Sequence, residues 1–182
     1  MTLLRRRQPG AFDEIYRRYQ DRIWRFLVRL VGRRDAAEDL FQDTWVAAAR
    51  NAHRLREDTQ LGAWLFTIAR NKHRNGLRFL AFERRKRAGL GADEPQDAAR
   101  PSPEEHAEAR ERAGRMAASF SSLPAAHREV LLLALIEGLE TSEIASILGL
   151  RQDAVRKRLS RARADLARAT GIDPRKAAVD EG

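Results

Sequence analysis

The chain contains no cysteine among its 182 residues. This absence excludes disulfide bonds, iron–sulfur clusters and zinc sites built from thiolates, and it fits a protein of the reducing cytoplasm. The four histidines are scattered, with no pair at the three- or four-residue spacing that a metal site on a helix would use. We therefore expect neither a bound metal nor a cofactor.

Long hydrophobic runs are also missing. No segment approaches the ~20 consecutive apolar residues that a membrane-spanning helix needs, and the basic start MTLLRRRQPG lacks the apolar stretch of a signal peptide. The sequence has no Gly-rich phosphate loop, no GxSxG motif and no evident pair of catalytic carboxylates. We predict a cytoplasmic protein that is not inserted into a membrane, has no catalytic residues and is not an enzyme.

Positive charge is abundant. Thirty-five Lys and Arg residues against 26 Asp and Glu give a formal net charge of +9 and a pI near 11.0. Such a balance favours a polyanionic partner, either nucleic acid or an acidic membrane face. A hydrophobic content of 43% is sufficient for a folded core, and the length allows one domain or two small ones.

The first half of the chain shows the spacing of amphipathic helices and no strand pattern. Apolar residues at three- and four-residue intervals predict a helix from about 10 to 31 that ends at Gly32. Asp35 followed by Glu38 is typical of a capping arrangement at the start of a second helix. A third helix is expected from Leu61 to about Phe82, with four residues on its inner face: Trp64, Leu65, Ile68 and Ala69.

The character of the sequence changes between residues 89 and 103. Three prolines and several acidic residues without a hydrophobic period predict a linker. Helices resume after it, one ending near Phe120 and another opened by Pro124 and leading to Gly138. We thus predict an all-α protein with helical domains at 1–88 and 108–172, an acidic Pro-containing linker at 89–107 and a tail at 173–182.

Residues 141–168 are the most informative stretch. Two short helices around Gly149 predict a helix-turn-helix. On the second helix, four apolar residues recur at helical spacing: Val155, Leu159, Ala162 and Leu166. The opposite side must then present the candidate DNA-reading residues Arg156, Lys157, Ser160 and Arg161. The alternative is a solvated hairpin, but seven cations against two carboxylates in residues 151–168 favour DNA binding.

A second basic stretch covers residues 69–87. Its cations, Arg70, Lys72 and Arg74 among them, alternate with Asn71, Asn75, Phe79 and Phe82. Phosphates attract the cations, unpaired bases can stack on rings, and an Asn amide can pair with a base edge, so the pattern is typical of single-stranded DNA binding. The alternative interpretation, which we favour for each ring taken singly, makes the two phenylalanines core or linker-packing residues.

An acidic stretch stands between these basic ones. Residues 35–49 contain four carboxylates and no basic residue. Asp39, Gln42 and Asp43 fall on one side of the predicted helix and would suit a basic protein partner. For Asp35 and Glu38 the alternative role is to complement the helix dipole.

Five motifs, in this order, resemble the bacterial sigma factors of the extracytoplasmic-function group (group 4 of the sigma-70 family): AEDLFQDTW, LGAWLFTIARN, LPAAHREVLLLALIEGL, TSEIASILGL and VRKRLSRAR. The resemblance implies a sigma factor that binds core RNA polymerase, directs it to specific promoters and assists promoter opening. One domain would attach to polymerase and melt the promoter, and the other would read its upstream element.

The resemblance also assigns roles by position. Asp39, Gln42 and Asp43 match the segment that binds the clamp helices of the polymerase's largest subunit. Asn71, Lys72, Arg74 and Asn75 match the region that holds the minus-ten strand with one base turned out. Arg156, Lys157, Ser160 and Arg161 match the residues that face the minus-thirty-five element.

The resemblance further implies an anti-sigma factor as a partner. Glu140 stands where the family often has a Ser cap, which leaves Thr141 as an alternative cap. Two rival functions stay open at this point. One is a helix-turn-helix repressor or response-regulator output domain that binds duplex DNA by itself. The other is a mimic that sequesters an anti-sigma protein.

Overall fold

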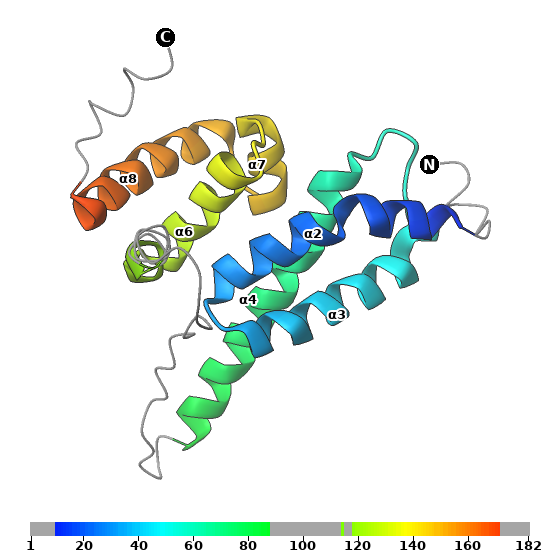
Figure 1. Ribbon diagram of the computed structural model, residues 1–182, viewed down its shortest axis with the longest axis horizontal. Coiled ribbons are helices and arrows are strands. Elements are labelled where there is room, and N and C mark those ends of the chain that lie inside the picture. Colours follow the sequence, from blue (N-terminus) through cyan, green and yellow to red (C-terminus); the bar gives the residue numbers. More distant parts are fainter. Residues whose placement is uncertain (1–9, 88–113, 115–117, 172–182) are drawn as a thin grey trace, which may run out of the picture. The chain divides into compact units, whose positions relative to one another are not determined.

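The computed structural model describes residues 10–87, 114 and 118–171, which contain helices and no strand. The chain divides into two compact units, Met1–Ala99 and Arg100–Gly182, each built from packed helices (Figure 1). The prediction of an all-α protein with two small domains is confirmed. The predicted linker at 89–107 and tail at 173–182 lie outside the described residues. None of the helices described is long and apolar enough to cross a bilayer.

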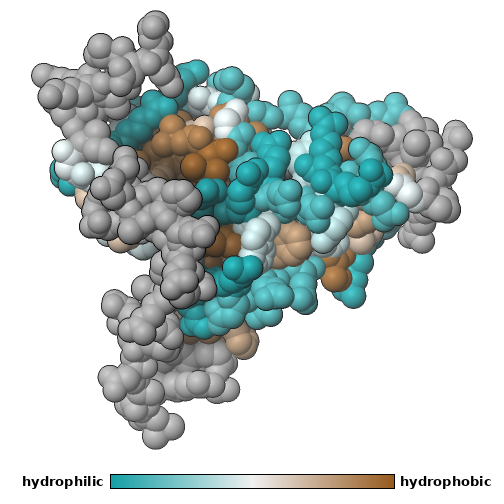
Figure 2. Space-filling view, in the orientation of Figure 1, coloured by the Kyte–Doolittle hydropathy of each residue, from teal (hydrophilic) through white to brown (hydrophobic). Residues whose placement is uncertain are grey.

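The first helix within the described residues is α2 (Ala11–Val31), as the apolar spacing predicts. It ends where Gly32 adopts φ 76° and donates its backbone N–H to the Val28 carbonyl at 2.9 Å, a conformation that favours glycine. One stripe of the helix is buried: Ile15, Ile23, Phe26, Leu27 and Leu30. Hydrophilic residues cover much of its other side (Figure 2).

The second helix, α3 (Arg34–Asn51), begins differently from the prediction. Arg33 is the extended N-cap residue, so Asp35 lies inside the first turn and does not cap the helix. The Arg33 guanidinium donates from Nε to Asp35 Oδ1 at 3.2 Å. This bond, and then the Ala36 backbone N–H, lower the pKa of Asp35. Asp35 therefore serves as a first-turn carboxylate, which the helix dipole favours.

A short 3₁₀ turn, η1 (Ala52–Arg54), and a loop lead to α4 (Leu61–Arg87). Phe66 is fully buried, and its ring meets Phe26 of α2 edge-on at 5.2 Å. The prediction for the inner face was partly wrong: Leu65 and Ala69 are buried, but Trp64 and Ile68 are only half-buried. The segment LGAWLFTIA is apolar on all sides, so its periodicity does not fix which side faces the core.

The second unit contains a helical segment at 118–122, then α6 (Ala125–Leu131), a π-helical turn η2 (Leu132–Ile136), α7 (Thr141–Leu148) and α8 (Gln152–Thr170). Pro124 is the N-cap of α6, as expected. In η2 the Glu137 N–H donates to the Leu132 carbonyl at 3.1 Å, five residues back. The core of the unit contains fully buried side chains from four elements: Val130, Leu131, Leu133, Ile144 and Val155.

A part-buried pair connects α6 to α8. His127 Nδ1 lies 2.6 Å from Asp165 Oδ2, and each side chain is 21% exposed. Arg168 also donates to Asp165. The bonds from His127 and then from Arg168 lower the pKa of Asp165, because both favour its charged form.

This lowered pKa predicts that acid weakens the second unit. The folded-state pKa of Asp165 lies below the ordinary value of 3.8, so its carboxylate stabilises the fold above that pH and loses the effect as pH falls through the folded pKa. The melting temperature of Asp165→Asn should therefore lie below that of the native chain near neutral pH. This difference in melting temperature between the two chains should disappear in acid. A difference in melting temperature that stays the same down to about pH 2 would contradict the role of the Asp165 carboxylate. Asp153→Asn, on the same helix but with its side chain 82% exposed, is the control and should show a smaller difference.

Candidate functional site: three charged surfaces

The acidic surface, Asp39, Gln42 and Asp43, lies on the outer side of α3, and all three residues are exposed. The opposite side of α3 holds the helix in the core through four buried residues: Ala37, Thr44, Trp45 and Ala48. Trp45 packs against Tyr16 at 4.7 Å between ring centroids and against Phe12 at 5.9 Å, so this ring has a packing role. In the described part of the chain, Asp39 and Gln42 form no side-chain hydrogen bond or ion pair.

The α4 surface, Asn71, Lys72, Arg74 and Asn75, begins just after the buried part of that helix. Asn71, Arg74 and Asn75 are exposed and Lys72 is half-buried. The position of Arg70 corrects the sequence interpretation, because this cation is only 8% exposed and cannot join a DNA-binding surface. Helical geometry explains the difference: Arg70 follows Phe66 by four residues and so lies on the core side.

An ion pair connects the acidic surface with the α4 surface. Lys72 Nζ lies 3.2 Å from Asp43 Oδ2, with the two side chains 36% and 62% exposed. The two residues are 29 positions apart in the sequence, which gave no sign of this contact. An ion pair at this exposure contributes about 0–1 kcal/mol. A stronger charged partner can therefore displace either side chain at little cost.

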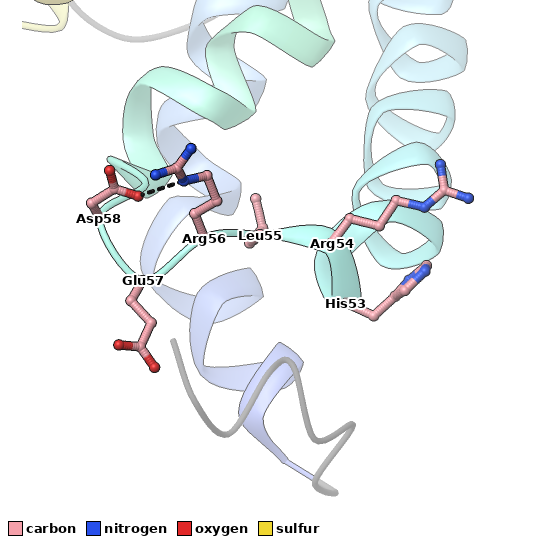
Figure 3. A pocket seen from close by; sticks show the side chains of 6 residues that line it. All are labelled: His53, Arg54, Leu55, Arg56, Glu57 and Asp58. Atoms are coloured by element: carbon pink, nitrogen blue, oxygen red, sulfur yellow. Dashed lines mark ion pairs between the residues drawn. The ribbon is translucent and has the colours of Figure 1, made fainter.

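The loop after α3 forms a hollow of about 500 Å³ that sequence reasoning missed (Figure 3). Six consecutive residues line it, from His53 to Asp58. Leu55 is buried and holds the loop to the core, while Arg56 pairs with Asp58 at 3.3 Å and both side chains remain exposed. The sequence feature that could have indicated this hollow is the segment HRLRED. It places an imidazole ring, two cations and two carboxylates between two helices.

The helix-turn-helix of the second unit forms through a Gly turn, as predicted. Gly149 adopts φ 64°, and two backbone bonds close α7: Leu150 N–H to the Ala145 carbonyl at 2.9 Å and Gly149 N–H to the Ser146 carbonyl at 3.3 Å. At the other end Glu140, not Thr141, is the N-cap. Its N–H donates to Glu143 Oε2 at 2.9 Å.

The α8 surface, Arg156, Lys157, Ser160 and Arg161, is exposed on the outer side of that helix. Val155, Leu159 and Ala162 are buried on the other side, as the periodicity predicts. Arg156 pairs with Asp153 at 2.7 Å, whereas the other three side chains have no hydrogen-bonding or ionic partner in the described ranges. Arg151 is the N-cap of α8 and makes no side-chain capping bond. The surface is thus free for an anionic partner.

Two family models match the chain. Residues 15–82 match sigma-70 region 2, and residues 114–166 match sigma-70 region 4. Among curated proteins, the chain is 30% identical over 155 residues to the RNA polymerase sigma factor CarQ of Myxococcus xanthus, covering 83% of this chain and 84% of that protein. It is 36% identical over 148 residues to the RNA polymerase sigma factor CnrH of Cupriavidus metallidurans, with 76% and 75% covered. A further relative is the extracytoplasmic-function sigma factor SigM of Mycobacterium tuberculosis, 30% identical over 162 residues, with 88% and 78% covered.

Two solved structures are similar over most of their length. One is the sigma factor RpoE from Bartonella quintana in complex with the anti-sigma factor NepR, with a TM-score of 0.75, 26% identity, and coverage of 89% of this chain and 98% of that one. The other is CnrH in complex with the cytosolic domain of CnrY, with a TM-score of 0.70, 27% identity, and coverage of 94% and 95%.

Proposed function

Because the chain belongs to the extracytoplasmic-function group of the sigma-70 family, we propose that it binds core RNA polymerase, directs it to specific promoters and assists their opening. Members of this family are transcription initiation factors. The proposed mechanism needs no active site. Binding free energy alone favours one location on DNA and then the open state of the promoter.

The acidic surface on α3 is the proposed attachment point for polymerase. Asp39, Gln42 and Asp43 suit a basic protein helix because carboxylates on an exposed surface accept charge-assisted hydrogen bonds from Arg and Lys. DNA is repelled by the same charges. The clamp helices of the largest subunit are the proposed partner.

The α4 surface is the proposed holder of the minus-ten strand. Exposed amides of Asn71 and Asn75 offer both a donor and an acceptor to the edge of an unpaired base, and Arg74 and Lys72 offer charge to its phosphates. The hollow at residues 53–58 belongs to the same unit, and as an open recess lined mainly by polar side chains it offers hydrogen-bonding groups to an extruded base. Holding such a base favours the melted promoter.

The α8 surface is the proposed reader of the minus-thirty-five element. A helix that follows a Gly turn and presents Arg156, Lys157, Ser160 and Arg161 offers the major groove both charge and directed hydrogen bonds. Arg is the side chain best suited to guanine because it can donate two parallel bonds.

An anti-sigma factor is the proposed regulator. The two similar structures are complexes of sigma factors with NepR and with the cytosolic domain of CnrY. By analogy, this chain would be held inactive by such a protein in the cytoplasm, where it meets polymerase.

The main support for the proposal is the exposure of the residues assigned to a partner. Ten of the eleven residues assigned to a partner are exposed, and Lys72 is half-buried. In vitro transcription with purified core enzyme and a promoter library tests it: the chain should produce initiation at a defined promoter class. Duplex binding without initiation would favour a repressor, which needs no acidic surface on α3.

A further inference from the structure

The later half of α4 exposes an unusual amount of apolar surface. Phe79 is 64% exposed and Phe82 is 65% exposed, and Leu77 and Leu80 in the same six positions are about half exposed. Phenylalanine is normally buried, and a cluster of exposed apolar side chains is typical of a binding surface. We therefore expect the two phenylalanine rings to contact a binding partner.

These rings are not core residues. Among the described side chains of α4, the buried ones lie between Ala63 and Arg70. The C-terminal part of α4 extends past the ends of α2 and α3 (Figure 1), and none of the described helices of the unit buries the two rings. The interpretation of Phe79 and Phe82 as core side chains is thus wrong. No described aromatic ring or cation stacks on either of them.

Helical geometry places the rings beside the two amides. Asn71, Asn75, Arg78 and Phe82 follow one another at steps of four, three and four residues, so they form a single strip along α4. Phe79, four residues after Asn75, borders this strip. Leu80 lies on roughly the opposite side of the helix.

We propose that Phe79 and Phe82 extend the α4 surface as a stacking platform for single-stranded DNA, so that bases next to those held by Asn71 and Asn75 stack on the rings. Asn75 and Phe82 are seven residues apart, or about 10 Å along the helix, which matches about three stacked nucleotides. Stacking on aromatic side chains accepts any base. The inference rests on the proposed function and adds two binding residues to it.

Charge selects nucleic acid over a protein as the occupant. The sequence from Asn71 to Phe82 contains three Lys and Arg residues, which are Lys72, Arg74 and Arg78, and no carboxylate. Arg85 lies three residues further along the helix. Arg74, Arg78 and Arg85 are all exposed. In single-stranded nucleic acid the phosphates would pair with these cations, and the bases would stack on the two rings.

The test uses holoenzyme assembled from core polymerase and the full chain. Binding of a fluorescent single-stranded oligonucleotide with the non-template minus-ten sequence is measured by anisotropy. Phe79→Ala and Phe82→Ala should each weaken binding by about 5- to 150-fold. Leu80→Ala removes a similarly exposed apolar side chain from the other side of α4, and it should leave binding unchanged.

Two further variants separate stacking from apolar docking. Phe82→Tyr keeps the ring and should bind like the native chain, whereas Phe82→Leu keeps the apolar character and should behave like Phe82→Ala. An oligonucleotide that lacks the base opposite the ring should bind the native chain and Phe82→Ala equally. Binding to a duplex with only the minus-thirty-five element should not change.

The results distinguish this inference from the proposed function. If Asn71→Ala and Asn75→Ala weaken strand binding but the two phenylalanine variants do not, the stacking platform is wrong and the proposed function stands. If none of the four changes strand binding, the α4 surface itself is wrongly assigned. Loss of holoenzyme assembly in Phe79→Ala or Phe82→Ala, or full binding by Phe82→Leu, would show that the rings dock a protein and would overturn the inference.

Discussion

Reversing both carboxylates of the acidic surface, in the double variant Asp39→Lys/Asp43→Lys, should weaken binding to core RNA polymerase by roughly 100-fold or more. Cations facing a basic helix cost several kcal/mol through repulsion and lost charge-assisted bonds, and about 3 kcal/mol corresponds to that factor. Fluorescence titration of labelled variant with core polymerase measures it. The fold should survive, because both positions are exposed.

Asp43→Lys also removes the pairing with Lys72, but an ion pair this exposed contributes at most about 1 kcal/mol to stability. The control is Asp13→Lys/Asp21→Lys, which makes the same change in net charge on exposed positions of α2. Its polymerase affinity should remain close to native. If the two double variants lose affinity for core polymerase equally, the net charge of the chain and not the acidic surface determines binding. If the α3 variant assembles like the native chain, polymerase attaches elsewhere.

Truncating Arg161 on α8 should have the largest effect on promoter choice. Arg161→Ala is expected to cost about 1–3 kcal/mol in binding to the cognate minus-thirty-five element, because a guanidinium directed at a base edge gives both affinity and discrimination. Affinity for unrelated duplex should fall much less, so the ratio between the two drops. Competition binding with cognate and unrelated duplexes measures that ratio.

Arg163→Ala provides the matched control, because it removes the same charge from another exposed position of α8. A lost phosphate contact weakens binding to every sequence alike and makes the salt dependence shallower. Arg163→Ala should therefore leave the ratio of affinities unchanged. Equal behaviour of Arg161→Ala and Arg163→Ala would mean that α8 binds DNA without reading it at Arg161.

The parts of the fold that periodicity and glycine determine locally could be predicted from the sequence. The helix-turn-helix was predictable from Gly149. The outer side of α8 was predictable from the apolar spacing of Val155, Leu159 and Ala162. Gly32 gave the end of α2. In these places one face of a helix is clearly apolar, so local spacing determines burial.

Other features depend on neighbours that the sequence does not reveal. The segment around Trp64 and Phe66 is apolar on every side, so only packing against α2 decides that Phe66 enters the core and that Arg70 follows it. The pairing of Lys72 with Asp43 exists only once α3 and α4 lie together, and the hollow at residues 53–58 depends on how the segment between these helices folds. The start of α3 was misassigned because Arg33 is the N-cap residue, which places Asp35 inside the first turn of the helix.

The central claim is that adjacent helices of the first unit contact different partners: α3 contacts polymerase and α4 contacts the melted strand. Photo-crosslinking from Gln42 and from Asn75, each replaced by a photoreactive residue in an assembled open complex, tests this directly. Gln42 should crosslink to the largest polymerase subunit and Asn75 to the non-template strand. Crosslinks from Gln42 to DNA, or from Asn75 to polymerase alone, would contradict the account.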